Sequence, residues 1–252
     1  MTTPSDIATT LDALLQVDRF QDSSHNGLQV QNSGRVARVC CAVDATLETF
    51  REAQRRGAGL ILCHHGLSWG DSLKRITHMN YERIGFLIRH DIALYTCHLP
   101  LDAHPRYGNN ACIARAIGLR RVVPFAAYHG REIGLHGTLP APVTLARLAA
   151  RLKAATGNTV TVMDFGKRTV RTVAMVVGGG AVGLEEAARL GVDVYLSGEP
   201  NLGARNTARD LGLSALFGGH YATESLGVQA IGKLVARRFG VRVEFIDLGV
   251  TV

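Results

Sequence analysis

The chain has 252 residues, enough for one large domain or two smaller ones with a buried core. Its hydrophobic content of 46% and charged content of 19% exclude a disordered or fibrous chain. No apolar run approaches the roughly 18 residues of a membrane-spanning helix, and the first residues lack the basic and apolar regions of a secretory signal. We therefore expect a cytoplasmic protein without a membrane segment.

The net charge of +7 comes mainly from arginine, because the 28 basic residues include only four lysines. These residues are scattered, and the densest run, R-E-A-Q-R-R from Arg51, is typical of a solvated helix face. Nucleic acid stays open as a partner, since charge alone gives only an electrostatic preference.

The cysteines indicate a reducing compartment. Five of them, at irregular spacing and without a C-x-x-C pair, are Cys40, Cys41, Cys63, Cys97 and Cys112. This usage predicts reduced, buried thiols and argues against zinc bound by cysteine.

Hydrophobic periodicity predicts alternating helices and strands in the first half of the chain. Residues 4–18 are expected to form a helix that starts at Ser5 or Asp6, and the turn Asn26-Gly27 leads into a short strand. The following expected elements are strand 36–44, helix 46–56, strand 59–63, helix 80–90, strand 92–97 and helix 109–117.

The middle of the chain, from about 120 to 170, is richer in β-branched strand segments, and βα units return after it. Expected here are strands 121–125 and 133–139, helix 142–153, strands 159–164 and 169–177, helix 184–190, strands 192–199 and 214–219, helix 223–239 and strand 243–249. This alternation predicts an α/β protein of two α/β lobes with largely parallel or mixed sheets. Residues 1–125 together with 190–252 are expected to form the metal-binding lobe or lobes, and 126–189 the middle, strand-rich segment of the second lobe.

Metal-ligating side chains follow three of the predicted strands. They are His64 and His65 after strand 59–63, then His98, Asp102 and His104 after strand 92–97, and His220 with Glu224 after the strand near 214. Ligands of open α/β sheets collect at the carboxyl ends of the strands, so we expect these side chains to come together. If the chain is helical from Tyr221 onward, His220 and Glu224 lie on one face, one turn apart.

Imidazole and carboxylate ligands without thiolate suit Zn, Mn, Fe or Ni rather than Mg or Ca. The set is larger than one ion needs, so we expect two divalent ions, which together can activate a water molecule and bind an oxyanion. His98 and His104 are candidates for transferring a proton or orienting a ligand carboxylate.

A second motif competes for the functional assignment. Residues 178–183 match G-x-G-x-x-G between a strand and a helix, and Glu199 lies about 20 residues on, as in a dinucleotide-binding fingerprint. The following helix and loop are short for a dinucleotide-binding unit. A tight glycine turn is the favoured interpretation.

Five strings together resemble the Ngg-interacting-factor-three-like family, whose members are commonly called GTP cyclohydrolase 1 type 2 homologues. The strings are H-N-G-L-Q-V (25–30), C-H-H-G-L-S-W (63–69), H-L-P-L-D-A-H-P-R-Y-G-N-N-A (98–111), S-G-E (197–199) and G-G-H-Y-A-T-E-S-L-G-V (218–228). They occur in the family's order over essentially the whole chain, in the shorter bacterial form. One departure is Gly66, where many relatives have proline.

The resemblance implies a dinuclear metal centre in a cleft between the two lobes, and a ring-shaped homohexamer. The metal ligands that it implies are His64, His65, Asp102, His220 and Glu224, with Glu224 as the bridging carboxylate.

The leading hypothesis is a metal-dependent hydrolase acting on a nucleotide-like or phosphorylated small molecule, with GTP ring opening as one version. In that version His98 or His104 shuttles the proton. The alternatives are a metal-binding or metal-delivery ring without turnover and a basic ring associated with DNA.

Overall fold

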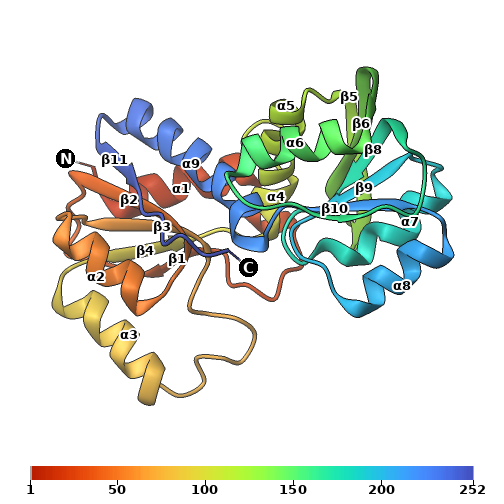
Figure 1. Ribbon diagram of the computed structural model, residues 1–252. Helices are drawn as coiled ribbons and strands as arrows, with labels where there is room; N and C mark the ends of the chain where they lie inside the picture. Colours follow the sequence, from red (N-terminus) through yellow and green to blue (C-terminus); the bar gives the residue numbers. More distant parts are fainter. Residues whose placement is uncertain (1, 252) are drawn as a thin grey trace. The chain divides into compact units, whose positions relative to one another are not determined.

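The computed structural model describes residues 2–251, which form two compact units (Figure 1). Unit 1 comprises residues 2–101 and Val228–Gly249, and unit 2 comprises Asp102–Gly227 with residues 250–251. Each unit contains one mixed β-sheet and its own helices, so the chain is an α/β protein of two lobes, as the sequence predicts. Two helices, α4 (Leu99–Ala103) and α9 (His220–Phe239), contain the boundaries between the units.

The predicted boundaries near residues 125 and 190 differ from those of the structure. Residues 102–125 and 190–227 belong to unit 2, because the strands within them pair in its sheet. The sequence pattern could not show this, since βα units look alike whichever sheet they join.

The five-stranded sheet of unit 1 has the order β1-β4-β3-β2-β11. Its strands are β1 (Gly27–Val30), β2 (Arg38–Asp44), β3 (Leu60–His65), β4 (Ala93–Thr96) and β11 (Arg242–Phe245). Only β1 is antiparallel to its neighbour. Asp44 lies beside His65, and Cys63 beside Thr96, so β2, β3 and β4 end at the same edge.

The helices of unit 1 are α1 (Pro4–Leu15), α2 (Leu47–Arg55), α3 (His78–Arg89) and the second part of α9, with a 3-10 turn at Val17–Arg19. Helix α1 begins at Pro4, within the expected range 4–18, but ends earlier, at Leu15. Its N-cap is Thr3 and not Ser5 or Asp6: the Thr3 hydroxyl accepts from the Asp6 N–H, and the Asp6 carboxylate accepts from the Thr3 N–H. Strand β3 is buried along nearly its whole length, which explains its unbroken apolar run.

The six-stranded sheet of unit 2 has the order β5-β6-β8-β9-β10-β7. Its strands are β5 (Arg120–Tyr128), β6 (Arg131–Thr144), β7 (Thr161–Met163), β8 (Thr169–Met175), β9 (Val194–Ser197) and β10 (Ser214–Phe217). Strands β8, β9 and β10 are parallel, and the remaining pairs are antiparallel. The two short strands expected at 121–125 and 133–139 form one long hairpin, closed by His129 and Gly130, both with positive φ.

The helices of unit 2 are α5 (Asn109–Ile117), α6 (Leu145–Thr156), α7 (Leu184–Arg189) and α8 (Leu202–Asp210), with a 3-10 turn, η2, at Gly180–Gly183. Helix α8 is absent from the elements expected from the sequence, because it buries only Ala204 and Ala208 and so lacks a strong apolar stripe. The core of the unit lies between helices and sheet, where Ile113, Leu148 and Val173 are fully buried.

The cysteines lie mostly in the interior. Cys40, Cys41, Cys63 and Cys97 are buried, as the sequence predicts, whereas Cys112 is partly exposed. Within residues 2–251, no helix is both long enough and apolar enough to cross a membrane.

Asp193 joins two neighbouring strands of unit 2. Its carboxylate accepts the backbone N–H groups of Arg171 and Thr172 at 2.8 and 2.9 Å, and it pairs with Lys167 Nζ at 2.7 Å. Burial acts to raise the pKa of Asp193, but these hydrogen bonds outweigh it and lower the pKa to about 2. Because the folded pKa is below the unfolded one, this stabilisation is present above about pH 4 and is lost as the pH falls through 2.

We expect Asp193→Asn to lower the free energy of unfolding at pH 7 by about 1–3 kcal/mol, because a charged acceptor is lost. Urea denaturation at pH 7 and pH 2.5 measures this, and the difference between variant and wild type should shrink at the lower pH. Asp210→Asn, at an exposed aspartate of unit 2, is the control. Equal effects of the two substitutions on the free energy of unfolding at pH 7 would contradict the stabilising role of the Asp193 hydrogen bonds.

Candidate functional site

Three histidines of unit 1 meet at the carboxyl-terminal edge of its sheet. His64 and His65 end β3, and His98 follows β4, the strand parallel to it. Because these strands end at the same edge, one nitrogen of each ring lies within 4.8 Å of the other two. His64 is fully buried, whereas His65 and His98 are partly exposed. His98, a possible ligand in the sequence but not one of the five implied by the family resemblance, thus joins the two adjacent histidines in one group.

Each of the three histidines uses Nδ1 for a hydrogen bond to an oxygen. The partners are the Cys97 carbonyl for His64 at 2.9 Å, Asp44 Oδ1 for His65 at 2.8 Å and Asp22 Oδ1 for His98 at 3.0 Å. A carbonyl or an ionised carboxylate can only accept, so Nδ1 carries a proton, and in the neutral form of the ring the lone pair is on Nε2. Metal-bound histidines have this arrangement, because the acceptor fixes the tautomer and makes the ring a stronger ligand.

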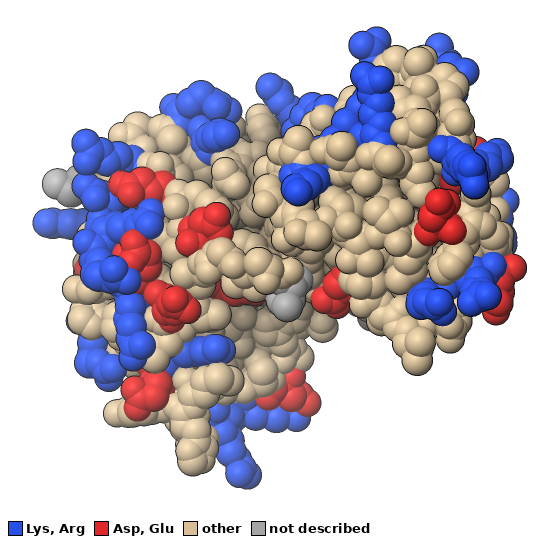
Figure 2. Space-filling model, in the orientation of Figure 1, with Lys and Arg blue, Asp and Glu red and all other residues tan. Residues whose placement is uncertain are grey.

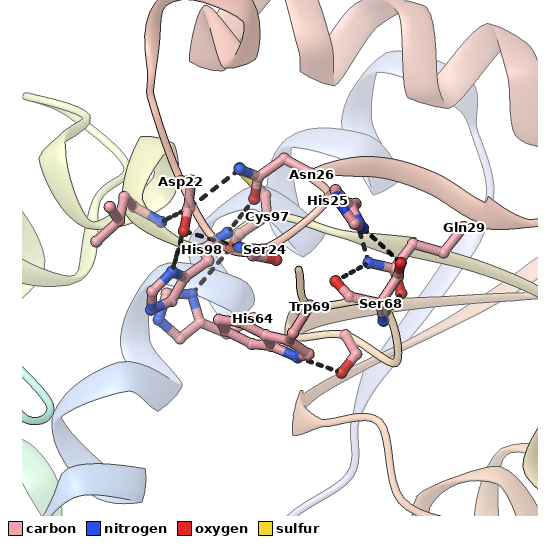
Figure 3. A network of polar contacts seen from close by, with 12 residues as sticks. Asp22, Ser24, His25, Asn26, Gln29, His64, Ser68, Trp69, Cys97 and His98 are labelled. Carbon is pink, nitrogen blue, oxygen red and sulfur yellow. Dashed lines mark hydrogen bonds and ion pairs between the residues drawn. The ribbon is translucent and has the colours of Figure 1, made fainter. Parts of the chain in front are cut away.

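Asp22 holds both the ring and the backbone at His98 (Figure 3). Its carboxylate also accepts the Leu99 N–H at 3.0 Å and Asn26 Nδ2 at 3.1 Å, and Asn26 Oδ1 accepts the His98 N–H at 2.7 Å. Burial acts to raise the pKa of Asp22, but hydrogen bonds from His98 and Asn26 outweigh it and lower the pKa to about 2. Asp22 is therefore ionised at neutral pH.

The loop that follows the two adjacent histidines is held by Gln29 of β1 (Figure 3). Gln29 Oε1 accepts the backbone N–H groups of Leu67 at 2.8 Å and Ser68 at 3.2 Å. A Cβ atom at residue 66 would lie 2.5 Å from this oxygen. Gly66 therefore leaves room for the Gln29 amide in this position, and a larger residue there would require Gln29 to shift.

Trp69 packs beside the histidine group (Figure 3). Its ring centroid lies 4.9 Å from that of His98, at 69°, and 5.9 Å from that of His65. Its Nε1 donates to the Gly66 carbonyl at 2.8 Å. Because Trp69 is itself anchored, these contacts restrict rotation of both imidazole rings.

The three other predicted ligands, Asp102, His220 and Glu224, belong to unit 2. His220 begins α9, and Glu224 lies one turn later with its Oε2 at 3.1 Å from His220 Nε2, as the sequence spacing predicts. Carboxylate oxygens of Asp102 and Glu224 lie within 4.8 Å of each other, and both residues are buried. Two buried carboxylates at this distance repel each other, and a bound cation would offset the repulsion.

His220 lies between two carboxylates, because its Nδ1 is also 3.2 Å from Glu199 Oε2. Burial acts to lower the pKa of His220, but Glu224 and Glu199 outweigh it and raise the pKa to about 9. Without a bound metal ion, the His220 ring is therefore doubly protonated and cationic at pH 7. A metal ion would have to displace one of these protons to bind a ring nitrogen.

Gly178 provides space for the ligands of unit 2. Its φ is +60°, and a Cβ atom there would lie 1.9 Å from Glu224 Oε1 and 3.0 Å from His220 Nε2. The Gly178 carbonyl accepts the Gly198 N–H at 2.9 Å. Only the 3-10 turn η2 and the six-residue helix α7 follow, so the glycine motif forms a tight turn that packs against the ligands.

His104 has a local role in unit 2. Its Nδ1 accepts the backbone N–H groups of Arg106 at 3.2 Å and Tyr107 at 3.0 Å. Burial lowers the pKa of His104, so the neutral ring is favoured. Among the described residues it belongs to none of the groups that could hold a metal ion, and its role as a proton carrier stays a prediction.

Sequence reasoning missed Asp22 and Asp44 and gave Glu199 a different role. A signal existed for Asp44, since it ends β2 at the same edge as β3. No local signal existed for Asp22, which lies 76 residues from its partner His98. Glu199 matched a ribose-binding acid in the sequence, whereas in the structure it contacts His220.

The ligands of both units fit divalent transition metals. Unit 1 offers the Nε2 atoms of three imidazoles whose Nδ1 atoms are hydrogen-bonded, and unit 2 offers one imidazole with buried carboxylates. Mixed nitrogen and oxygen ligands without thiolate suit Zn, Mn, Fe or Ni.

Fold and ligands define an α/β protein of two units with His, Asp and Glu groups able to hold metal ions. Residues 2–249 match the sequence profile of Duf34/NIF3 (NGG1p interacting factor 3), and the chain belongs to this family.

Relatives and solved structures agree with this assignment. The chain is 40% identical to a GTP cyclohydrolase 1 type 2 homolog of Deinococcus radiodurans, over 92% of this chain and 88% of the relative. It is 42% identical to the protein of the same name from Halobacterium salinarum, over 96% and 97% of the two chains. The solved structure of protein ybgI, described as of unknown function, superposes with a TM-score of 0.93 at 32% identity, over the full length of both chains.

We expect Asp44→Ala to weaken metal binding by about 10–100-fold, because His65 loses the acceptor that orients its ring. Competition with a chelating indicator measures the affinity. Asp71→Ala, at an exposed aspartate paired with Lys74, is the control. Unchanged affinity in Asp44→Ala would contradict the role of this carboxylate.

We expect Gly178→Ala to weaken metal binding at least tenfold, because the added methyl group displaces Glu224. Gly191→Ala is a matched control, since Gly191 has a similar φ of +67° but a Cβ atom there would have no neighbour within 4 Å. Thermal melting shows whether either variant is destabilised, and metal content shows whether either variant has lost metal binding. If both bind metal equally well, the contact at Gly178 does not limit the site.

Proposed function

We propose that this protein is a metal-dependent hydrolase that binds two divalent ions and acts on a nucleotide-like or phosphorylated small molecule. The observation that carries the proposal is the hydrogen bond from Nδ1 of each of His64, His65 and His98 to an oxygen acceptor. Three neighbouring imidazoles that all donate from Nδ1 to an oxygen acceptor are typical of metal ligands. Packing of a hydrophobic core does not require such an arrangement.

In the proposed assignment His64, His65 and His98 are ligands from unit 1, and Asp102, His220 and Glu224 are ligands from unit 2. A divalent ion held by these residues would supply Lewis-acid activation of a water molecule and stabilise developing negative charge on the substrate. Asp44 holds His65, and Asp22 holds His98, with the proton on Nδ1, so that Nε2 is the atom that would bind the metal ion. Glu199, whose side chain is nearly half exposed, orients His220 and is a candidate for taking up a proton.

The name shared by the relatives suggests GTP as a substrate. Hydrolysis of its imidazole ring consumes water and releases C8 as formate. The homohexamer and association with DNA stay predictions from the sequence.

We expect His98→Ala to lower the metal content of the purified protein, because one of three unit 1 ligands is lost. His90→Ala, at an exposed histidine of the same unit, is the control. Elemental analysis by mass spectrometry gives the number of ions per chain. An unchanged metal content together with lost activity would instead assign His98 to proton transfer.

We expect the metal-loaded protein to release formate from GTP, and Glu224→Gln to lose this activity together with bound metal. A known GTP cyclohydrolase serves as the positive control in the same assay. Full metal occupancy without formate release would exclude GTP ring opening. If phosphate monoesters are not hydrolysed either, the non-catalytic metal-binding alternative replaces the proposal.

A further inference from the structure

Unit 2 contains a cavity of about 560 Å³ that none of the metal ligands lines. It lies among the end of α5, the start of β5, the 140–143 segment of β6 and one turn of α6. Three of its lining residues are arginines, Arg115, Arg120 and Arg151, and no lining residue is acidic. Its volume is in the range of sites for small molecules.

The positive charge of this cavity is not neutralised by carboxylates. Arg151 Nη1 donates to the Ile117 carbonyl at 3.0 Å, and Arg115 Nη2 donates to Cys112 Sγ at 3.1 Å. Among the described residues, no ion pair joins any of the three arginines to Asp or Glu. The carboxyl end of α5 contributes only about half a negative charge. Roughly two and a half positive charges are left, which a dianion would nearly balance.

A second arginine-lined cavity, in unit 1, differs because carboxylates pair with most of its arginines. It is lined by Arg38, Arg55, Arg56 and Arg242. Glu52 pairs with two of these arginines and Glu244 with two, at 2.5–3.8 Å. In Figure 2 the basic and acidic side chains of unit 1 are interspersed near β2 and β11. The unit 2 cavity lacks such compensation.

The remaining wall of the unit 2 cavity is largely apolar. Ile117 and Leu119 are buried beneath it, and Pro140 and Val143 line the side formed by β6. Arginines beside an apolar wall suit a ligand with an anionic group on an apolar body. We propose that this cavity binds a phosphate monoester of a small molecule, separately from the metal ligands. The guanidinium groups bind the phosphate, and the apolar wall contacts the organic group.

Calorimetric titration of the full chain with phenyl phosphate, at pH 8 and low salt, tests the proposal. We expect binding with and without EDTA, because the cavity contains no metal ligand. Arg120→Ala should weaken binding at least tenfold, whereas Arg147→Ala, one turn before Arg151 on α6 and outside the cavity, should change it less than twofold. Thermal melting verifies that both variants fold.

Further titrations distinguish the ligand class. Inorganic phosphate should bind more weakly than phenyl phosphate, because it lacks the organic group, and phenol should not bind. Binding that disappears with EDTA would locate the phosphate at the metal ligands and overturn the proposal. Equal affinity of Arg120→Ala and wild type would also overturn it. So would a single-stranded oligonucleotide that binds more tightly and displaces phenyl phosphate, because the cavity would then recognise nucleic acid.

Discussion

The parallel pairing of β2, β3 and β4 determines where the histidines of unit 1 lie. Parallel strands end at one edge, and their register places Asp44 next to His65. The same edge receives His98 directly after β4. His65 and its hydrogen-bond acceptor Asp44 thus come from neighbouring strands, and rigid sheet geometry fixes the distance between them.

Two glycines allow side chains from other elements to approach the backbone next to the candidate ligands. At Gly66 and Gly178, a methyl group would overlap with Gln29 and Glu224, respectively. Both glycines occur in strings that suggest a function by themselves, H-H-G-L-S-W and G-x-G-x-x-G. Their physical role is the same in each case, because a side chain from another element must approach the backbone closely.

The two units prepare their ligands differently. In unit 1 hydrogen bonds from Nδ1 of the histidines to oxygen acceptors fix the orientation of each ring and direct Nε2 toward a ligand. In unit 2 the two buried carboxylates of Asp102 and Glu224 bring negative charge together, and the same carboxylate Glu224, with Glu199, raises the pKa of His220. Both arrangements favour binding of a divalent cation, the first through lone pairs and the second through charge.

The sequence by itself determined the alternating elements, the burial of most cysteines and the positions of the candidate ligand segments at strand ends. It also determined the pairing of His220 with Glu224, because helical periodicity is local. Only the tertiary structure decided which strands share a sheet, and with it the limits of the two units. It also decided the partners of the histidines, such as Asp22 for His98 across 76 residues. The physical reason is that strand order and register depend on contacts between distant segments, of which local sequence patterns carry no record.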